Sequence, residues 1–309
     1  MSSEAEGRFH MVDVSSITYG PRRATLLTDD GVRIEAVYEP CTASVTETGG
    51  AATAVVVAHG FTGSVDRPAV RRASRVLAER AAVVTFSFRG HGRSGGRSTV
   101  GDREVLDLSA AVRWARELGH ARVVTVGFSM GGSVVLRHAA LERPTGDRAP
   151  GDGEPEEGGS PEKGGERARD GRGYAGGARQ RPGAYADAVA AVSAPARWYY
   201  RGTPSMRRVH WVITRRAGRL VGRLGLRTRI HHRDWDPVPL SPVEAVPLIA
   251  PTPLLIVHGD RDPYFPLDHP RMLAAAGPAE LWLERGMGHA ENAAGDELLR
   301  RLGDWLTRA

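Results

Sequence analysis

Ser129 lies in the stretch VVTVGFSMGGSVV (residues 123–135), where it follows a β-branched run and precedes a helix-like continuation. Gly127 and Gly131 flank it at two residues on either side. This G-x-S-x-G pattern between a strand and a helix is typical of a sharp turn that lifts a serine hydroxyl clear of a sheet. The helix that follows directs backbone N–H groups and a partial positive charge toward the turn. The pattern predicts that Ser129 is a nucleophile.

A glycine-rich turn before a helix has two other interpretations, a phosphate-binding loop and a simple helix cap. A dinucleotide-binding loop is followed by an acidic residue about 20 positions on, at the end of the next strand. Here the chain instead enters a segment without large apolar side chains. The nucleophile hypothesis is favoured because its chemical partners follow in the sequence.

A serine nucleophile needs a general base and an orienting carboxylate, expected in the order Ser, acid, His. The stretch HGDRDPYFP (residues 258–266) follows an apolar run and offers two candidate acids, Asp260 and Asp262. The stretch ERGMGHAEN (residues 284–292) follows the next run and places His289 in a glycine-flanked loop. Each candidate comes just after the carboxyl end of a predicted strand, where open α/β sheets build their sites. The three residue types together predict acyl transfer.

Acyl transfer also needs donors for the oxyanion of its intermediate. The stretch VVVAHGFTGS (residues 55–64) follows a predicted strand, and His59 and Gly60 shape a turn there. The backbone N–H of Phe61 can then point to the same place as that of Met130. Such donors contribute about 3 kcal/mol of transition-state stabilisation each. We predict Phe61 and Met130 as the oxyanion donors and His59 as a structural residue.

The elements that must position these residues alternate between strands and helices. A hairpin is expected around Asp29, Asp30 and Gly31 because these are turn residues. Continuous apolar runs predict buried parallel strands over residues 54–58, 83–88, 123–126, 188–192, 254–257 and 281–283. Helical patterns cover residues 67–79, 104–118, 132–141, 269–276 and 291–307. This order predicts an α/β sheet with helices on both faces.

Residues 143–185 contain no Val, Ile, Leu, Met, Phe or Trp, and their eight acidic and eight basic side chains cancel. Such a segment cannot bury enough apolar surface to offset the entropy of ordering it. We expect a disordered insertion rich in Gly, Pro and charged residues. The core is then formed by residues 1–142 and 186–309.

The overall composition is that of an ordinary globular chain, with 25% charged and 41% hydrophobic residues among 309. Cys41 is the single cysteine, so no intrachain disulfide can form, and neither a metal nor a cofactor is expected. No run of about 18 apolar residues occurs, and the first residues lack the basic and apolar pattern of a signal peptide. A soluble, cytoplasmic protein is expected.

The net charge of +6 is concentrated in one segment. Residues 196–233 hold eleven arginines and no acidic residue, whereas the rest of the chain carries 31 basic and 36 acidic groups. Lys163 is the only lysine, which indicates a coding bias toward arginine. A nucleic-acid partner is not expected, because the charge is confined to this segment and no reader motif accompanies it.

Five motifs resemble those of the α/β-hydrolase superfamily, near its bacterial esterase and lysophospholipase-like members. In order they are AHGFTGS, FSFRGHGRSGG, GFSMGG, HGDRDPYFP and GMGHAE. The resemblance covers roughly residues 20–142 and 186–309. It implies the α/β-hydrolase fold, with a mostly parallel central sheet, helices on both faces and a helical cap at about residues 196–247, before the acid-bearing strand. It also implies that residues 89–96 form a structural loop beside the site, in which a ligand role for His91 is not expected.

The resemblance further selects the acid, because Gly259 and Pro266 fit the family's spacing around Asp262 and leave Asp260 as a turn residue. The implied protein is a serine hydrolase that cleaves a carboxylic ester of a small molecule through Ser129, Asp262 and His289 and an acyl-enzyme. A thioesterase, an amidase or an acyltransferase would use the same triad. A non-catalytic ligand-binding homologue is the alternative outside enzymes.

The cap segment predicts one amphipathic helix, with apolar residues at three- and four-residue steps and arginines on a neighbouring face. The apolar positions are Val209, Ile213, Ala217, Leu220 and Leu224, and the basic ones are Arg215, Arg219 and Arg223. Nearby aromatic residues either line a pocket or belong to the core; they are Trp198, Tyr199, Tyr200, Trp211 and Trp235. The basic face has three interpretations: a solvated surface, which we favour, a weak contact with an anionic membrane surface, or a site for carboxylated substrates.

Overall fold

The computed structural model describes residues 20–42, 52–143 and 183–309. Within these ranges eight strands form one sheet in the order β1-β2-β4-β3-β5-β6-β7-β8. The disordered insertion predicted for residues 143–185 lies almost wholly outside the described residues. No helix of the described ranges is both long enough and apolar enough to cross a bilayer.

The sheet begins with an antiparallel hairpin of β1 (Arg22–Leu27) and β2 (Arg33–Glu39), as predicted from the turn residues between them. β2 pairs antiparallel with β4, and every later pairing is parallel. The remaining strands are β3 (Thr53–Ala58), β4 (Ala82–Phe86), β5 (Arg122–Phe128), β6 (Val189–Val192), β7 (Leu254–Gly259) and β8 (Glu280–Glu284). The expected mostly parallel sheet is therefore confirmed.

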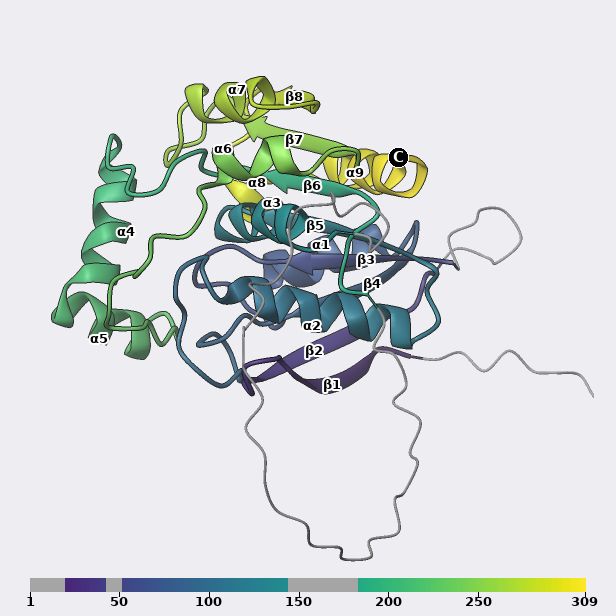
Figure 1. Ribbon diagram of the computed structural model, residues 1–309, viewed down its shortest axis with the longest axis horizontal. Helices are drawn as coiled ribbons and strands as arrows, with labels where there is room; N and C mark the ends of the chain where they lie inside the picture. Colours follow the sequence, from purple (N-terminus) through teal and green to yellow (C-terminus); the bar gives the residue numbers. More distant parts are fainter. Residues whose placement is uncertain (1–19, 43–51, 144–182) are drawn as a thin grey trace, which may run out of the picture.

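Helices cover both faces of the sheet (Figure 1). Alternate residues of β3 point to opposite faces, so Val56 packs in one core and Val57 in the other. The first core includes α2 (Glu104–Glu117), α3 (Met130–Leu141), α6 (Pro242–Ala245), the 3₁₀ helix η2 (Val246–Leu248) and α7 (Asp268–Ala275). The second includes α1 (Pro68–Leu77), α8 (Ala290–Ala293) and α9 (Asp296–Arg308). The predicted last helix over residues 291–307 is thus two helices, because Ala294 and Gly295 are extended.

The cap stands apart from the sheet, at the left of Figure 1. Between residues 203 and 225 it forms two helices, α4 (Pro204–Thr214) and α5 (Arg216–Leu224), where the sequence predicted one. Arg215 is extended, with φ −93° and ψ 142°, and ends the first helix. The two helices pack closely, because a Cβ at Gly218 would lie 2.7 Å from the Cα of Val212. The prediction of a single amphipathic helix was wrong. The spacing of apolar residues along the chain does not reveal that the segment folds back and packs one helix on the other.

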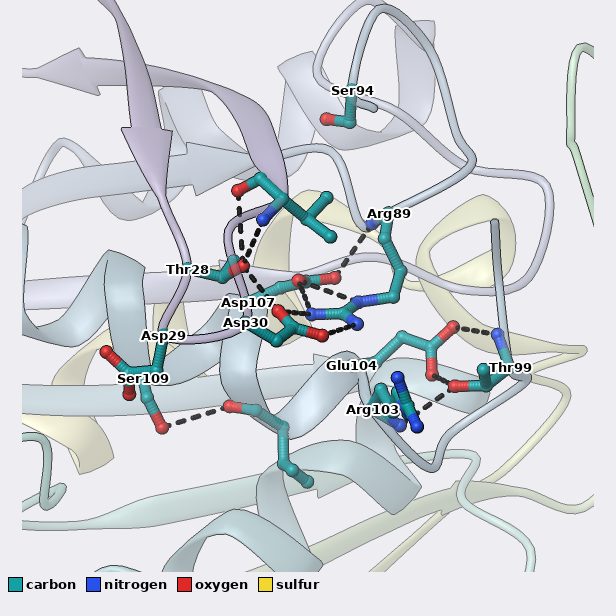
Figure 2. A network of polar contacts seen from close by, with 12 residues as sticks. Thr28, Asp29, Asp30, Arg89, Ser94, Thr99, Arg103, Glu104, Asp107 and Ser109 are labelled. Atoms are coloured by element: carbon teal, nitrogen blue, oxygen red, sulfur yellow. Dashed lines mark hydrogen bonds and ion pairs between the residues drawn. The ribbon is translucent and has the colours of Figure 1, made fainter. Parts of the chain in front are cut away.

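A buried guanidinium connects three elements next to the site. Arg89, just after β4, donates to both oxygens of Asp30 in the β1–β2 turn, at 2.7 and 3.0 Å. It also donates to Asp107 of α2 at 2.8 and 3.0 Å. Figure 2 shows the guanidinium between the two carboxylates. Arg89 therefore fastens the loop of residues 89–96 to the sheet and to α2.

Glu104, at the start of α2, holds the neighbouring loop that faces the cap. Its carboxylate accepts from the hydroxyls of Ser98 and Thr99 at 2.8 and 2.6 Å, and from the N–H groups of residues 99–101. Backbone bridges then join this side of the core to the cap, between His91 and Thr228 and between Ser98 and Ile230. The cap is therefore attached to a fixed loop.

Candidate active site

Ser129 sits at the turn between β5 and α3, at the carboxyl end of the sheet's central strands. Its φ of 52° and ψ of −113° are a strained backbone conformation that residues other than glycine rarely adopt. The turn is possible because glycines let backbone segments approach: a Cβ at Gly131 would lie 2.6 Å from the carbonyl carbon of Ala58. A Cβ at Gly127 would likewise collide with the carbonyl of Gly131. The spacing of the motif thus has a steric cause.

The structure brings Ser129, His289 and Asp262 together from three different loops. His289 Nε2 lies 2.8 Å from Ser129 Oγ, and His289 Nδ1 lies 2.6 Å from Asp262 Oδ2. With the imidazole neutral and protonated at Nδ1, the Nδ1–H donates to the carboxylate and Nε2 accepts from the serine hydroxyl. This arrangement can take a proton from the hydroxyl.

The side chain of Asp262 is fully buried, and both of its carboxylate oxygens accept hydrogen bonds. Its Oδ1 accepts from the backbone N–H groups of Tyr264 and Phe265, at 2.8 and 3.1 Å. Burial opposes ionisation, but the hydrogen bond and charge of His289, with the two N–H donors, hold the pKa of Asp262 below its usual value. The carboxylate is therefore ionised where it contacts the imidazole.

Asp260, the other candidate acid, has a different role. It is exposed, and its carboxylate accepts from the N–H of Gly286 at 2.6 Å. That bond joins the loop after β7 to the loop before His289. The geometry therefore brings Asp262, and not Asp260, against the imidazole.

The predicted oxyanion donors face the same cavity as the serine. Phe61 and Met130 line it together with Ser129 and His289. Among the described residues, no acceptor binds the backbone N–H of Phe61 or of Met130. Both groups are therefore available to a ligand.

His59 holds the turn that carries Phe61. It is fully buried; Nδ1 donates to the carbonyl of Gly60 at 2.7 Å, and Nε2 accepts from the N–H of Phe88 at 3.0 Å. Burial lowers the pKa of His59 to about 3, so the ring stays neutral. These contacts support the structural role expected for His59.

Sequence reasoning missed Glu291, two residues after His289. The residue is 5% exposed and lines the cavity, and its Oε1 accepts from the N–H of Gly60 at 3.1 Å. Its Oε2 has no partner among the described residues. Burial raises the pKa of this carboxyl. The only signal in the sequence was its place at the end of the GMGHAE motif.

A cavity of about 890 Å³ extends from Ser129 into the cap. Four of the five cap aromatics line it, namely Trp198, Tyr199, Tyr200 and Trp235, together with Tyr264 and Phe265 of the loop after β7. Trp211 does not line it and is 46% exposed. The aromatic cluster is thus a pocket wall at four positions and a surface residue at one.

Charged groups at the cavity are mainly cationic. Its lining includes five arginines of the cap, Arg197, Arg201, Arg208, Arg219 and Arg233. The acidic lining residues are Asp234 and Glu291. Within the described ranges, no cluster of three or more His, Cys, Asp or Glu side chains is arranged to hold a metal ion.

The chain belongs to the alpha/beta hydrolase family, whose sequence profile matches residues 55–301. A Pyrococcus furiosus esterase has a similar structure, with a TM-score of 0.61 and 20% identity over 99% of this chain and 98% of its own. The α/β hydrolase GrgF from Penicillium has a TM-score of 0.60 and 17% identity, over 93% and 98% of the two chains. The esterase domain of a Rhodothermus marinus protein gives 0.54 and 20%, over 93% and 96%. A comparison with curated protein sequences finds no match.

Proposed function

We propose that this protein is a serine hydrolase that cleaves carboxylic esters through Ser129, His289 and Asp262. The observation that carries the proposal is the continuous chain of hydrogen bonds from Asp262 through His289 to Ser129, at 2.6 and 2.8 Å, beside a cavity. The family assignment and the fold it shares with esterases support the same activity.

Acylation begins when His289 Nε2 takes the proton of the Ser129 hydroxyl and Oγ attacks the carbonyl carbon of the ester. The carbonyl oxygen becomes an oxyanion, which accepts hydrogen bonds from the N–H groups of Phe61 and Met130. Asp262 orients the imidazole and stabilises its cation. As the tetrahedral intermediate collapses, Nε2–H donates its proton to the leaving alcohol, and the acyl group stays on Oγ.

Deacylation repeats these steps with water. His289 takes a proton from the water molecule, whose oxygen attacks the acyl carbon and forms a second oxyanion in the same place. Collapse of this intermediate releases the carboxylic acid and returns the proton to Ser129 Oγ. No group other than the three side chains and two backbone donors is required.

The cavity wall favours a substrate with an apolar or aromatic part. Aromatic rings gather near the nucleophile, and the ring centroids of Tyr264 and His289 lie 4.3 Å apart. Val209, Val212 and Ile213 of α4 extend the apolar lining into the cap. An acyl chain or an aromatic acid would bury its surface there.

The experiment is a panel of p-nitrophenyl esters of increasing acyl length, with a lysophospholipid, an acyl-CoA and an anilide, on wild type and Ser129→Ala. We expect ester turnover that the Ser129→Ala substitution abolishes. Faster turnover of the thioester or the anilide would favour a thioesterase or an amidase, and acyl transfer to an added alcohol in preference to water would favour an acyltransferase. Tight binding without turnover of any substrate would favour a non-catalytic ligand-binding protein and would overturn the proposal.

A further inference from the structure

The outer face of α5 combines apolar and basic side chains. Gly218 and Gly222 are the buried residues of this helix, so positions 216, 220, 223 and 224 share the opposite face. Leu220 is 56% exposed and Leu224 is 72% exposed. Arg216 and Arg223 are exposed beside them. A short helix with this composition presents leucines to its surroundings between two positive charges.

The arginines of residues 196–233 differ from those of the rest of the protein in their partners. Nine arginines outside this segment form ion pairs with Asp or Glu: Arg23, Arg72, Arg80, Arg89, Arg113, Arg116, Arg137, Arg300 and Arg301. Inside it, only Arg197 does so among the described residues, with Asp268 at 3.8 Å. In the described part of the chain, the other arginines of residues 196–233 therefore have no acidic partner in an ion pair. A coding bias toward arginine explains the number of arginines but not this difference in pairing.

We propose that the outer face of α5 docks on an anionic lipid surface. Exposed leucines insert at the boundary between headgroups and acyl chains, and flanking cationic side chains bind anionic headgroups. A nucleic acid would use the arginines but not the leucines, and a solvated cap needs neither the leucines nor the excess charge. On the other side of the helices, Val212, Ile213 and Arg219 line the cavity, so docking brings the cavity close to the lipid.

The docking proposal implies a substrate class for the proposed hydrolase, namely esters of lipids. Only this implication rests on the proposed function. The docking itself is tested without catalysis. Ser129→Ala protein is mixed with vesicles of phosphatidylcholine alone, or with about 30 mol% phosphatidylserine, and floated across a salt series. We expect binding to the anionic vesicles only, weakening as salt rises.

Three variants locate the surface. The first replaces Arg215, Arg216 and Arg223 by Gln, all of them exposed and outside the cavity lining. The matched control replaces Arg75, Arg271 and Arg285 by Gln, which removes the same charge from exposed positions elsewhere. The third is Leu220→Ser with Leu224→Ser. Thermal unfolding checks that each variant is folded. Hydrolysis of a short soluble ester provides a second check, made on versions of the variants that keep Ser129.

We expect the cap arginine variant to lose binding about 100-fold, since each of its three basic residues near an anionic surface contributes roughly fivefold. The leucine variant should also bind more weakly, and the matched control should bind as wild type. Equal loss in the matched control would mean that net charge alone acts and would overturn the proposal. Full binding by the leucine variant would also overturn it, because it would indicate a simple polyanion site such as one for nucleic acid. So would the absence of any binding by the protein with its native cap.

A second, independent observation concerns Glu291. A Cβ built on Gly60 would lie 3.2 Å from both oxygens of this carboxyl and 3.4 Å from the Cβ of Ser129. The carboxyl and the nucleophile thus lie against the same residue, next to Phe61. Its Oε1 accepts from the Gly60 N–H at 3.1 Å, and its Oε2 is buried without a partner among the described residues.

We infer that Glu291 is a positioning residue for the turn that carries the Phe61 N–H, and that it acts as a neutral carboxylic acid. Its carbonyl oxygen accepts from Gly60 and fixes the peptide before Phe61. A carboxylate there would place negative charge beside the position of the oxyanion and oppose its formation.

The groups that face Glu291 are consistent with the neutral form. His289 on the same loop is the titratable neighbour, and its charge lowers the pKa of Glu291, but burial raises it more. From α1, Arg72 donates at 2.9 Å to the main-chain oxygen of Glu291. From the turns after β3 and β5, the neighbours are the Gly60 N–H and the uncharged Ser129 side chain. None of these is a cation bound to the carboxyl oxygens.

The test compares kcat and KM for Glu291→Ala and Glu291→Gln across pH on a soluble ester. We expect Glu291→Ala to lower kcat about tenfold or more with little change in KM, because the oxyanion donors act in the transition state. Glu291→Gln, whose amide oxygen can accept from Gly60, should restore most of that loss. The wild-type kcat should fall as pH rises through the raised pKa of this carboxyl, and this fall should be absent in Glu291→Gln.

Wild-type kcat in Glu291→Ala would overturn the assignment. So would a Gln variant as impaired as the Ala variant, which would mean that the ionised form is needed. If Glu291→Ala does not fold, the pH profile of Glu291→Gln decides, because a fall of kcat with rising pH that is unchanged from wild type contradicts the neutral-acid role. Ester turnover by wild type is the control. If wild type hydrolyses the ester, a negative result with the Glu291 variants counts against the role of Glu291 and not against the proposed function.

Discussion

Replacing Gly131 by alanine should disrupt the turn that presents Ser129. The new Cβ would lie 2.6 Å from the carbonyl carbon of Ala58 and 2.7 Å from the carbonyl oxygen of His59. Ordinary contact begins near 3.4 Å, and the carbonyl oxygen of Ala58 lies closer to the new Cβ than its carbon does, so the start of α3 and the end of β3 must separate by more than about 0.8 Å. These two segments carry the Met130 and Phe61 donors, and the substitution therefore spreads the oxyanion site.

A misplacement near 1 Å can lower the rate about 100-fold, and overpacking a close contact costs about 1–3 kcal/mol of stability. We expect kcat of Gly131→Ala on a soluble ester to fall about 100-fold while part of the fold is kept. The assay is steady-state hydrolysis, with thermal unfolding of the same samples. Gly295→Ala is the matched control, because a Cβ there meets nothing within 4 Å.

The control should keep its kcat and its unfolding temperature. If Gly131→Ala hydrolysed the ester at the wild-type rate and unfolded at the wild-type temperature, the close approach of β3 and α3 would not be needed. The steric account of the motif would then be refuted.

Three other predictions follow from the polar contacts. Asp262→Asn should lower kcat by about 10⁴-fold, as loss of the triad acid does elsewhere, whereas Asp260→Asn should leave kcat unchanged in the same assay. The pKa of Asp262 is lower in the folded than in the unfolded protein. The ionised carboxylate therefore stabilises the fold above its unfolded pKa, and this stabilisation is lost as pH falls through its folded pKa. The free energy of unfolding should therefore fall less steeply with decreasing pH in Asp262→Asn than in wild type. Arg89→Met should cost about 3–5 kcal/mol in urea unfolding because it leaves the buried carboxyl group of Asp107 without its cation. Arg300→Met, at an exposed pair, should cost less than about 1 kcal/mol.

The central sheet was predictable from sequence because its strands are buried on both faces, which produces uninterrupted apolar runs. The approach of Ser129 and His289 was predictable because both follow strands that end at the same edge of a parallel sheet. Position after the strand left two candidate acids, and the resemblance to the family's spacing selected Asp262. The structure agrees, with Asp262 against the imidazole and Asp260 bonded to the N–H of Gly286, a contact that the sequence does not predict.

The cap was the part that local patterns described least well. The helices α4 and α5 pack on each other, and two short backbone bridges join the cap to the core. An apolar side chain of the cap can therefore face the other helix, the cavity or the outside. Leu220 and Leu224 fitted a helical period but lie outward, and Arg215 breaks the helix although nothing in its residue type requires it. Glu291 was missed for a related reason, since its partner Gly60 is 231 residues away along the chain.

The most direct test of the account is covalent labelling of the intact protein with a fluorophosphonate, followed by peptide mass spectrometry. We expect one adduct, on Ser129, formed rapidly in wild type, much more slowly in His289→Gln and not at all in Ser129→Ala. A folded wild-type protein that leaves Ser129 unmodified, or that is labelled equally fast without the imidazole, would contradict the claim that His289 activates this serine.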